Sequence, residues 1–343
     1  MKPRLQHIPE WRDVDAGKFL REIATRYVPA VLKGFVADWP AVRLGLQSAQ
    51  AIAGYLDALD KGGEVDVLIA PAREKGRIFY DASMEGFNFT RAKLTISAVN
   101  EQLLRYAKFD SRPMVVAQSA LIADCIPGFT AENRLSLLPA TIAPRIWLGN
   151  AVVTPAHFDE SNNIACVVSG KRRFTLFPPE QVGNLYAGPL GHAPTGTPIS
   201  LVSFREPDFE RFPRFRDALA AALVAELEPG DALYIPTLWW HHVESLAKYN
   251  VLVNYWWKGA SDAPGKAESA HDPLLHCLLN LNHVSPEHRV GRDLQPLRVP
   301  CRRRSRRADP GERPRRPGRH IAGTRAAGAG LPRGEIATLK PGC

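Results

Sequence analysis

The sequence feature that most constrains this chain is the tripeptide His157-Phe-Asp159, followed about eighty residues later by Trp-Trp-His241-His242. If the tripeptide lies in a β-strand, its side chains alternate between two faces, so His157 and Asp159 point to the same side. Two imidazoles and one carboxylate on a rigid scaffold form the facial triad that holds Fe(II) and leaves coordination positions open. The pattern therefore predicts a metal site.

Strand parity decides which of the two adjacent histidines completes this triad. His241 shares a strand face with Trp239 and Val243, whereas His242 lies on the other face. Because the more apolar face is expected to point inward, we predict His241 as the third ligand. A lone inward histidine would be an ordinary core residue, but an inward carboxylate such as Asp159 is costly unless it is paired or bound to a metal.

The chain from residue 114 onward predicts a β-structure. Short β-branched and aromatic runs are broken about every eight to twelve residues by Pro or Gly, which is typical of a sandwich or barrel. The candidate strands are Met114–Gln118, Arg145–Gly149, Ala156–Asp159, Asn163–Ser169, Arg172–Phe177, Ala232–Ile235, His242–Ser245 and Asn250–Trp257. They suit a double-stranded β-helix, the two-sheet jelly roll of cupins. The predicted fold class is therefore mainly β with α additions.

The predicted domain organisation has four parts. Residues 1–112 form an α/β lead-in packed on the barrel, and residues 113–260 form the β-helix core. An insertion at 178–229 interrupts the core and is a lid, a wall of a substrate site, or a plain connector. Residues 261–290 form a helical segment with a leucine stripe typical of core or dimer packing. Residues 291–343 form an Arg-, Pro- and Gly-rich tail.

Local patterns predict the elements outside the core. Residues 11–60 are expected to be mostly helical, apart from the short apolar run Pro29–Leu32, which suits a strand. Leu94–Tyr106 has the spacing of an amphipathic helix. Val65–Ala70 and Ile78–Tyr80 resemble strands. Within the insertion, Phe212–Glu226 has a helical pattern.

The basic residues that follow Gly170 suggest an anion site. Arg172 alternates with Phe174 and Leu176, so it lies on the apolar face, whereas Lys171 lies on the other face. An inward guanidinium needs an anion, and it can bind a carboxylate through two parallel hydrogen bonds. The anion is either the distal carboxylate of a dicarboxylate co-substrate or an Asp or Glu side chain in a buried ion pair.

The positive charge of the chain is concentrated at its C-terminal end. Residues 291–343 contain thirteen Arg and one Lys against four acidic residues, a net charge of +10. Since the whole chain carries +9, the remainder is close to −1, which argues against a nucleic-acid partner for the main body. Three interpretations of the tail stay open: a basic disordered arm that binds polyanions, an inert linker, or a GC-rich gene read out of frame near residue 290.

Cysteine spacing and hydropathy indicate the cellular setting. The five cysteines lack the paired spacing of a zinc site or a disulfide framework, which predicts free thiols in a reducing compartment. The first residues lack the apolar run of a signal peptide, and no stretch approaches eighteen consecutive apolar residues. We therefore expect a soluble, cytoplasmic protein with no membrane segment.

Taken together, these motifs resemble the cupin-like JmjC oxygenases, which are Fe(II)- and 2-oxoglutarate-dependent hydroxylases. Within that family the pattern is close to that of the asparaginyl hydroxylase of hypoxia-inducible factor. The resemblance covers about residues 10–260 and is carried by His157-Phe-Asp-Glu-Ser-Asn-Asn163, Gly170-Lys-Arg-Arg-Phe-Thr-Leu-Phe-Pro-Pro179, Trp-Trp-His241-His-Val-Glu-Ser245 and Asn254-Tyr-Trp-Trp257.

The resemblance implies specific roles for residues of this chain. It implies His157, Asp159 and His241 as iron ligands. It places Thr154, Asn163 and Asn254 at polar contacts to 2-oxoglutarate. The basic co-substrate residue of the family, commonly Lys in the asparaginyl hydroxylase, falls on Arg172, with Lys171 as the second candidate. The implied cofactor is Fe(II), and the implied co-substrate is 2-oxoglutarate, which is converted to succinate and CO₂ while a substrate C–H bond is hydroxylated.

The substrate and the assembly stay open at this point. A protein side chain, a free amino acid and a small metabolite all fit, and the C-terminal helical segment suggests a homodimer. Alternatives to a hydroxylase are a JmjC-type demethylase, a cupin enzyme that does not use 2-oxoglutarate, and a non-catalytic cupin-type ligand-binding or regulatory module. Five aromatic residues near the motifs line the cavity or pack in the core: Trp239, Trp240, Tyr255, Trp256 and Trp257.

Overall fold

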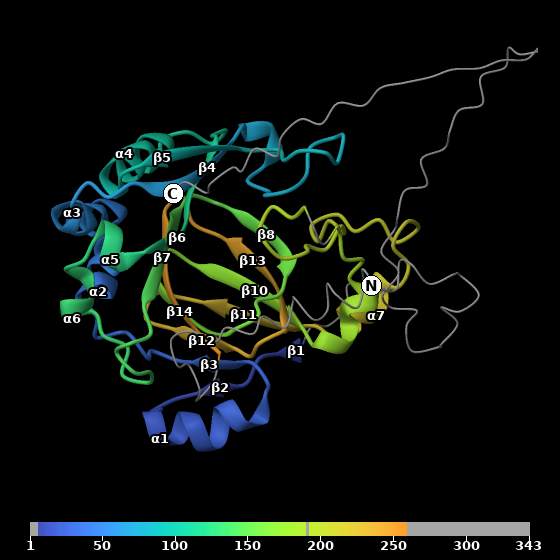
Figure 1. Cartoon of the computed structure of the whole chain (residues 1–343), viewed down its shortest axis with the longest axis horizontal. Helices are drawn as coiled ribbons and strands as arrows, with labels where there is room; N and C mark the ends of the chain where they lie inside the picture. The colour runs from blue at the N-terminus through green and yellow to red at the C-terminus, as the bar shows by residue number, and fades with distance from the viewer. Residues whose placement is uncertain (1–5, 190–191, 259–343) are drawn as a thin grey trace, which may run out of the picture. The chain divides into compact units, whose positions relative to one another are not determined.

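Two β-sheets face each other in the computed structural model, which describes residues 6–189 and 192–258 (Figure 1). Within these ranges the smaller sheet has the strand order β1 (Gln6–His7), β11 (Leu223–Leu227), β10 (Arg172–Phe177), β13 (Trp240–Ser245) and β8 (Val153–His157). The larger sheet has the order β2 (Glu10–Trp11), β3 (Ala30–Leu32), β12 (Ala232–Ile235), β9 (Asn162–Ser169), β14 (Asn250–Trp257), β7 (Pro144–Gly149), β6 (Met114–Leu121), β4 (Val65–Ala70) and β5 (Thr90–Leu94).

Helices are mostly short and lie outside the sheets (Figure 1). In the described part of the chain they are α1 (Ala16–Lys18), α2 (Pro40–Gln47), α3 (Ala49–Leu59), α4 (Ile96–Tyr106), α5 (Ile122–Cys125), α6 (Phe129–Glu132) and α7 (Phe215–Ala220). Single turns of 3₁₀ or π geometry occur at Phe19–Ile23, Ala24–Arg26, Ala72–Glu74 and Pro179–Asn184. The expected jelly roll with α additions is confirmed, and the two sheets do not close into a continuous barrel.

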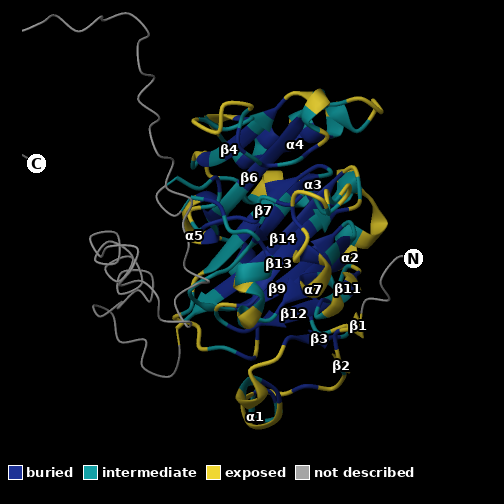
Figure 2. Cartoon of the chain, turned by 90° about the vertical axis from the view of Figure 1, so that its right-hand side faces the viewer, coloured by how far each residue is buried: buried dark blue, intermediate teal, exposed yellow. Residues whose placement is uncertain are grey.

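Three of the four apolar clusters in the described residues form layers on the faces of the two sheets. One layer lies between the sheets and includes Phe174, Leu176 and Val243 of the smaller sheet and Val167 and Leu252 of the larger sheet. Figure 2 shows these central strands as buried, with the exposed residues concentrated around them. Strands β9, β12 and β14 are covered on both faces, and their sequences are nearly continuous apolar runs.

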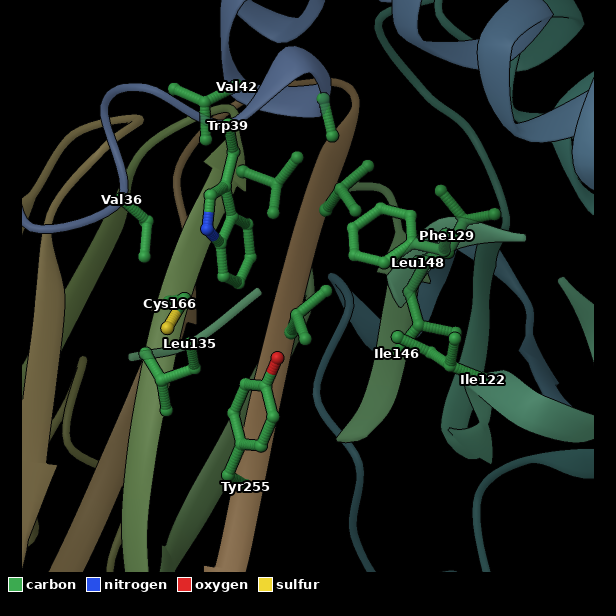
Figure 3. Close-up of a cluster of buried hydrophobic side chains, with 14 of the residues drawn as sticks. Val36, Trp39, Val42, Ile122, Phe129, Leu135, Ile146, Leu148, Cys166 and Tyr255 are labelled. Atoms are coloured by element: carbon green, nitrogen blue, oxygen red, sulfur yellow. The ribbon is translucent and has the colours of Figure 1, made fainter. Parts of the chain in front are cut away.

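The second layer joins helices α2, α3, α5 and α6 to the outer face of the larger sheet (Figure 3). Trp39, which precedes α2, packs edge-to-face on Phe129 of α6, with ring centroids 6.1 Å apart. Ile146 and Leu148 of β7 and Cys166 of β9 face the same layer and are fully buried. Burying these large side chains gives the hydrophobic stabilisation that holds the helices on the sheet.

The third layer lies on the outer face of the smaller sheet, under the insertion. Phe177 of β10 and Trp240 of β13 pack there with Val202, Phe212 and Phe215 of the insertion. The insertion is therefore anchored by a core of its own.

The helical part of the insertion is shorter than expected, because α7 ends at Ala220 and β11 begins at Leu223. The predicted helix Phe212–Glu226 was wrong over its second half: Ala225 and Leu227 are buried between the sheets, and pairing with β10 overrides the local pattern.

The structure also tests the other local predictions of helices and strands. The strand at Val65–Ala70 is confirmed, and the helix predicted at Leu94–Tyr106 begins at Ile96, because Leu94 ends strand β5. The strand expected at Ile78–Tyr80 is reduced to one isolated bridge, between Tyr80 and Phe87. The strand expected at Pro29–Leu32 is observed as β3. The rest of residues 11–60 contains less helix than expected, since turns occupy residues 33–38.

Strands of the expected lead-in are continuous with both sheets. β1 pairs with β11 of the smaller sheet, while β3 pairs with β12 and β4 with β6 of the larger sheet. The segment thus extends the sheets, in addition to packing on them. The helical segment predicted at 261–290 and the tail at 291–343 lie outside the described residues. Within the described residues, no helix is both long and apolar enough to cross a membrane.

Asp231 ties the lead-in to the core at the turn between β11 and β12. Its carboxylate accepts hydrogen bonds from Lys33 Nζ (2.6 Å), from the Gly34 amide (3.0 Å) and from the Glu228 amide (3.1 Å). The side chain is nearly buried, so the charge is held by these donors rather than by water. Gly230 precedes it at φ +99°, a conformation that favours glycine and allows the tight turn.

We expect Asp231→Ala to lower the free energy of unfolding by about 3 kcal/mol, because the substitution leaves Lys33 and two backbone amides without their acceptor. Urea denaturation gives this value. The matched control is Asp110→Ala, since Asp110 is fully exposed and pairs with Lys248 at 3.3 Å. An exposed pair contributes little to stability. Equal losses in the two variants would contradict the anchoring role of Asp231.

Candidate metal centre

Pairing of β8 with β13 brings the predicted triad together. His157 and His241 are directly opposite each other in this antiparallel pair, and their ring centroids are 4.3 Å apart. Asp159 lies two residues beyond the end of β8, and its Oδ2 is 3.6 Å from His241 Nε2. One candidate ligand atom from each residue lies within 4.8 Å of the others. The strand predicted for Ala156–Asp159 ends earlier than expected, at His157, yet the carboxylate still meets the two imidazoles.

Backbone carbonyls orient both imidazole rings. His157 Nδ1 lies 2.9 Å from the Pro155 carbonyl oxygen, and His241 Nδ1 lies 3.1 Å from that of Trp239. A carbonyl oxygen only accepts, so each Nδ1 donates a proton to it, and in the neutral ring the lone pair then lies on Nε2. This tautomer is the one that presents Nε2 to a metal ion.

Burial keeps the ring of His157 neutral. Removal from water, followed by the nearby His241, lowers the pKa of His157 to about 4 from 6.5. A metal ion requires a deprotonated ligand nitrogen, so the site needs no proton release from this ring at neutral pH.

A chain of hydrogen bonds fixes the carboxylate of Asp159. Trp256 Nε1 donates to Asp159 Oδ2 at 3.0 Å, and Asn163 Nδ2 donates to the same oxygen at 3.4 Å. Asn254 Nδ2 donates to Asn163 Oδ1 at 3.2 Å, and Trp147 Nε1 donates to Asn254 Oδ1 at 2.8 Å. Such partners set the direction from which a carboxylate meets a metal.

A cavity of ≈ 550 Å³ contains the three residues of the triad. Its walls come from strands of both sheets and from the insertion. They also include all but one of the residues that the sequence suggested for 2-oxoglutarate: Thr154, Asn163, Arg172 and Asn254. Pro194, Thr195 and Gly196 of the insertion line the same cavity, so part of the insertion forms a wall.

Arg172 is a buried cation without a protein anion. It is 8% exposed, its Nε has no hydrogen-bond partner, and among the described residues no carboxylate lies within ion-pair distance of it. Burial lowers the pKa of the guanidinium to about 10. The group therefore remains charged at neutral pH, and a buried unpaired charge is costly. The buried ion pair that the sequence left open is not present in the described part of the chain.

Lys171 lies outside this cavity. Its Nζ pairs with Glu226 at 3.2 Å and with Glu228 at 3.5 Å, at the protein surface. The reason is the turn at Gly170, which has φ +77° and connects β9 of the larger sheet to β10 of the smaller one. A Cβ at Gly170 would collide with the Asn250 side chain. This turn sets the register that turns Arg172 inward and Lys171 outward.

His242 occupies the opposite face of β13 from His241. Its ring lies 4.2 Å from that of Phe204, measured between centroids, beneath the insertion.

Of the five aromatic residues considered from the sequence, Trp256 lines the cavity. Trp239, Trp240 and Tyr255 belong to the three apolar layers, and Trp257 packs against the layer on the larger sheet.

The mouth of the cavity contains residues that the sequence did not identify. Strand β6 has an irregularity between Ala117 and Ala120, where Ser119 adopts φ +49°. Arg145 Nη1 donates to the Ser119 carbonyl at 2.8 Å, and its guanidinium lies 5.7 Å from the Trp256 ring centroid. Bulges of this kind commonly re-aim side chains beside active sites. The sequence offered no signal for this one.

The sequence profile of the cupin-like domain matches residues 16–263, which is more than half of the chain. The chain belongs to the cupin-like domain family. This confirms the family predicted from the motifs and agrees with the two-sheet fold.

Relatives of this cupin-like protein include JmjC proteins. HSPB1-associated protein 1 of Bos taurus is 26% identical over 265 residues, which cover 73% of this chain and 52% of the relative. Lysine-specific demethylase JMJ32 of Arabidopsis thaliana is 25% identical over 302 residues, covering 78% of this chain and 86% of the relative. JmjC domain-containing protein D of Dictyostelium discoideum is 36% identical over 103 residues, 30% of this chain and 22% of the relative. The chain thus spans about half the length of the bovine relative.

The donor set of the triad fits the Fe(II) used by JmjC oxygenases. Two neutral imidazole nitrogens and one carboxylate match the ligand preference of non-haem Fe(II), and their atoms are close enough to share one ion. The unpaired guanidinium of Arg172 in the same cavity fits a carboxylate-bearing co-substrate.

We expect Trp256→Phe to weaken metal binding about tenfold, because the variant keeps an aromatic ring but loses the N–H that orients Asp159. Anaerobic titration with Fe(II) or Co(II) measures this affinity. Trp257→Phe is the matched control, since Trp257 packs against Phe19 and Tyr234. Equal affinities in Trp256→Phe and the unsubstituted protein would contradict the role of this hydrogen bond.

We expect the metal-free protein to lose stability as the pH falls from about 6.5 to about 4. Burial lowers the pKa of His157 to about 4 and that of His242 to about 3, from 6.5 in an exposed chain. In this window the unfolded state binds protons that the folded state does not, so the free energy of unfolding decreases with falling pH. Urea denaturation at several pH values checks this. His242→Phe should flatten the dependence, and an unchanged slope would oppose it.

Proposed function

We propose that this cupin-like protein is an Fe(II)- and 2-oxoglutarate-dependent oxygenase that hydroxylates a protein side chain or a small molecule. The observation that carries the proposal is the unpaired, buried Arg172 in the same cavity as the His157–Asp159–His241 cluster. A metal site alone would suit many cupin reactions. A cation held without a protein partner beside it favours an acidic co-substrate.

The strand register separates Arg172 from the metal-binding residues by a distance that one dicarboxylate can bridge. His241 pairs with Leu176 of β10, and Arg172 lies four residues before Leu176 on the same strand. This places Arg172 about 13 Å along the strand from the metal-binding end. An arginine side chain together with a five-carbon dicarboxylate spans such a separation. One carboxylate of 2-oxoglutarate would lie at Arg172, and its keto acid end would lie at the metal.

The other cavity residues have supporting roles in this proposal. Thr154 and the Asn163–Asn254 pair offer polar groups to the co-substrate and, through Asn163, hold Asp159 in place. Phe174 and Leu252 give the cavity apolar walls that exclude water. His157, Asp159 and His241 would hold the iron. When bound, Fe(II) with 2-oxoglutarate and O₂ supplies the oxidising power that inserts an oxygen atom into a substrate C–H bond.

The relatives suggest a protein as substrate or partner. One is named for association with HSPB1 and another as a lysine-specific demethylase. Demethylation is the second candidate, because JMJ32 aligns over most of both chains and the same oxidation of an N-methyl group releases formaldehyde.

The free, buried thiols of Cys125 and Cys166 fit a reducing, cytoplasmic compartment. A homodimer stays a proposal, since it rests on residues 261–290.

The test is anaerobic titration with Fe(II) and then 2-oxoglutarate, following the visible charge-transfer band of the chelate. We expect the band in the unsubstituted protein and none in Asp159→Ala. Arg172→Met should raise the half-saturating 2-oxoglutarate concentration about 100-fold, because two charge-assisted hydrogen bonds are lost. Lys171→Met should leave it unchanged.

The outcomes separate the candidates. Iron binding without the band would exclude 2-oxoglutarate and favour another cupin chemistry. A larger effect of Lys171→Met than of Arg172→Met would refute the co-substrate site. If the band forms, incubation with O₂ and methyl-lysine peptides decides between the two oxygenase activities, because formaldehyde release supports the demethylase and a stable alcohol supports the hydroxylase.

A further inference from the structure

A second, smaller cavity lies on the other side of the β8–β13 pair from the candidate metal centre. Its volume is ≈ 120 Å³. Its walls come from three separate parts of the chain: Glu74, Lys75 and Arg77; Val153, Pro155 and His242 of the β8–β13 pair; and Val202 to Glu206 of the insertion. Strand parity excluded His242 from the triad, the other lining residues were not considered as ligands from the sequence, and none has a role in the proposed oxygenase reaction.

His242 offers this cavity a polar group with no protein partner. The residue is 4% exposed, and neither ring nitrogen has a hydrogen-bond partner in the described structure. Its ring is held in place by Phe204, with 4.2 Å between the centroids. An imidazole carries at least one N–H in every protonation state, so the buried ring always has a donor to satisfy. An unsatisfied buried donor is costly and therefore informative.

Arg77 supplies a second unsatisfied donor to the same cavity. Its guanidinium carbon lies 3.5 Å from the centroid of the Phe79 ring, which fixes the plane of the group. Its Nη2 is buried without a hydrogen-bond partner in the described residues, and no Asp or Glu among them lies within ion-pair distance. Two donors, one of them cationic, thus line one cavity, and no acceptor among the described residues lies within hydrogen-bond distance of them.

The charges around the rim do not cancel these donors. Lys75 and Arg205 are exposed cations, and Glu74 and Glu206 are the acidic residues of the lining. The Glu74 carboxylate is already engaged by Asn88 Nδ2 at 3.0 Å and by Arg73 Nε at 3.3 Å. The lining holds three cations and two carboxylates, and Arg205 also lies 3.7 Å from Glu244. Lys75 and Arg77 are the lining cations that form no ion pair in the described residues.

We propose that this cavity is a binding site for a small oxyanion, a carboxylate or a phosphate group, held by Arg77 Nη2 and a ring N–H of His242. An oxyanion accepts from both donors at once and neutralises the guanidinium. Apolar Val153, Pro155 and Val202 close the base of the site. Water alone could accept from these donors, but it would leave the positive charge of Arg77 uncompensated.

The site is distinct from the proposed 2-oxoglutarate cavity. His242 and His241 are neighbours on β13, and their side chains point in opposite directions. Arg172 lies between the sheets rather than under the insertion. An oxyanion bound here would contact the backs of the strands that carry His157 and His241. It would connect residues 74–77 to the insertion across those strands.

The experiment uses the full chain with inorganic phosphate as the probe. Imidazole ¹⁵N NMR of histidine-labelled protein reports the ring of His242 directly, and thermal unfolding at increasing phosphate concentration reports the affinity. We expect saturable shifts of the His242 nitrogens and a saturable rise in the unfolding temperature. Arg77→Met keeps the apolar stem beside Phe79 and should weaken phosphate binding about tenfold, as expected for one charge-assisted hydrogen bond.

Two control variants make the outcome specific. Arg172→Met removes the cation of the larger cavity, which can itself hold phosphate, so the His242 nitrogens and not the unfolding temperature are read in this variant. Arg91→Met removes an exposed cation that lines the larger cavity. In both variants the His242 nitrogens should respond to phosphate as they do in the unsubstituted protein. His242→Phe retains the ring against Phe204 and should also bind more weakly, which covers the case in which Arg77→Met fails to fold. Loss of binding in Arg172→Met with normal binding in Arg77→Met, or His242 signals that do not respond to phosphate, would overturn the proposal.

Discussion

The antiparallel pairing of β8 with β13 is the interaction on which the site depends. It sets His157 opposite His241, and the Pro155 and Trp239 carbonyls then orient the two rings. Ala156 of β8 and Trp240 of β13 pack in the core under the insertion, and Val243 of β13 packs in the core between the sheets. A shift of one residue in this pairing would turn one histidine away from the other. The insertion therefore supports the chemistry although its sequence carries no catalytic motif.

The structure tolerates unsatisfied polar groups on both sides of this strand pair. Among the described residues, Arg172 has no anion partner between the sheets, and neither the His242 ring nitrogens nor Arg77 Nη2 have a hydrogen-bond partner under the insertion. Each would weaken folding if it stayed unpaired, because a buried donor loses its hydration. Sites where a chain keeps such costs are expected to be functional ones. The two cavities are separated by one layer of β-strand, so ligands on both sides would stabilise the same element.

Sequence patterns predicted the inner strands well and the outer ones poorly. β9, β10, β12 and β14 are apolar runs bounded by turn residues, and their positions were found within a residue or two. β1, β2, β5 and β11 were missed, since they are short or carry mixed patterns and become strands only by pairing with a neighbour. The apolar spacing of Phe212–Glu226 suits a helix as well as a strand, and only its contact with β10 distinguishes them.

The sequence by itself determined the chemistry that is available. Spacing and strand parity predicted that His157, Asp159, His241 and Arg172 face the interior between the sheets, because alternation along a strand is a local property of the backbone. Only the tertiary structure decided how these groups are supported. The indole of Trp256 on Asp159, the bulge in β6 and the absence of a carboxylate near Arg172 in the described residues all depend on distant segments meeting. Local spacing carries no information about such contacts, since they arise from the packing of strands far apart in the chain.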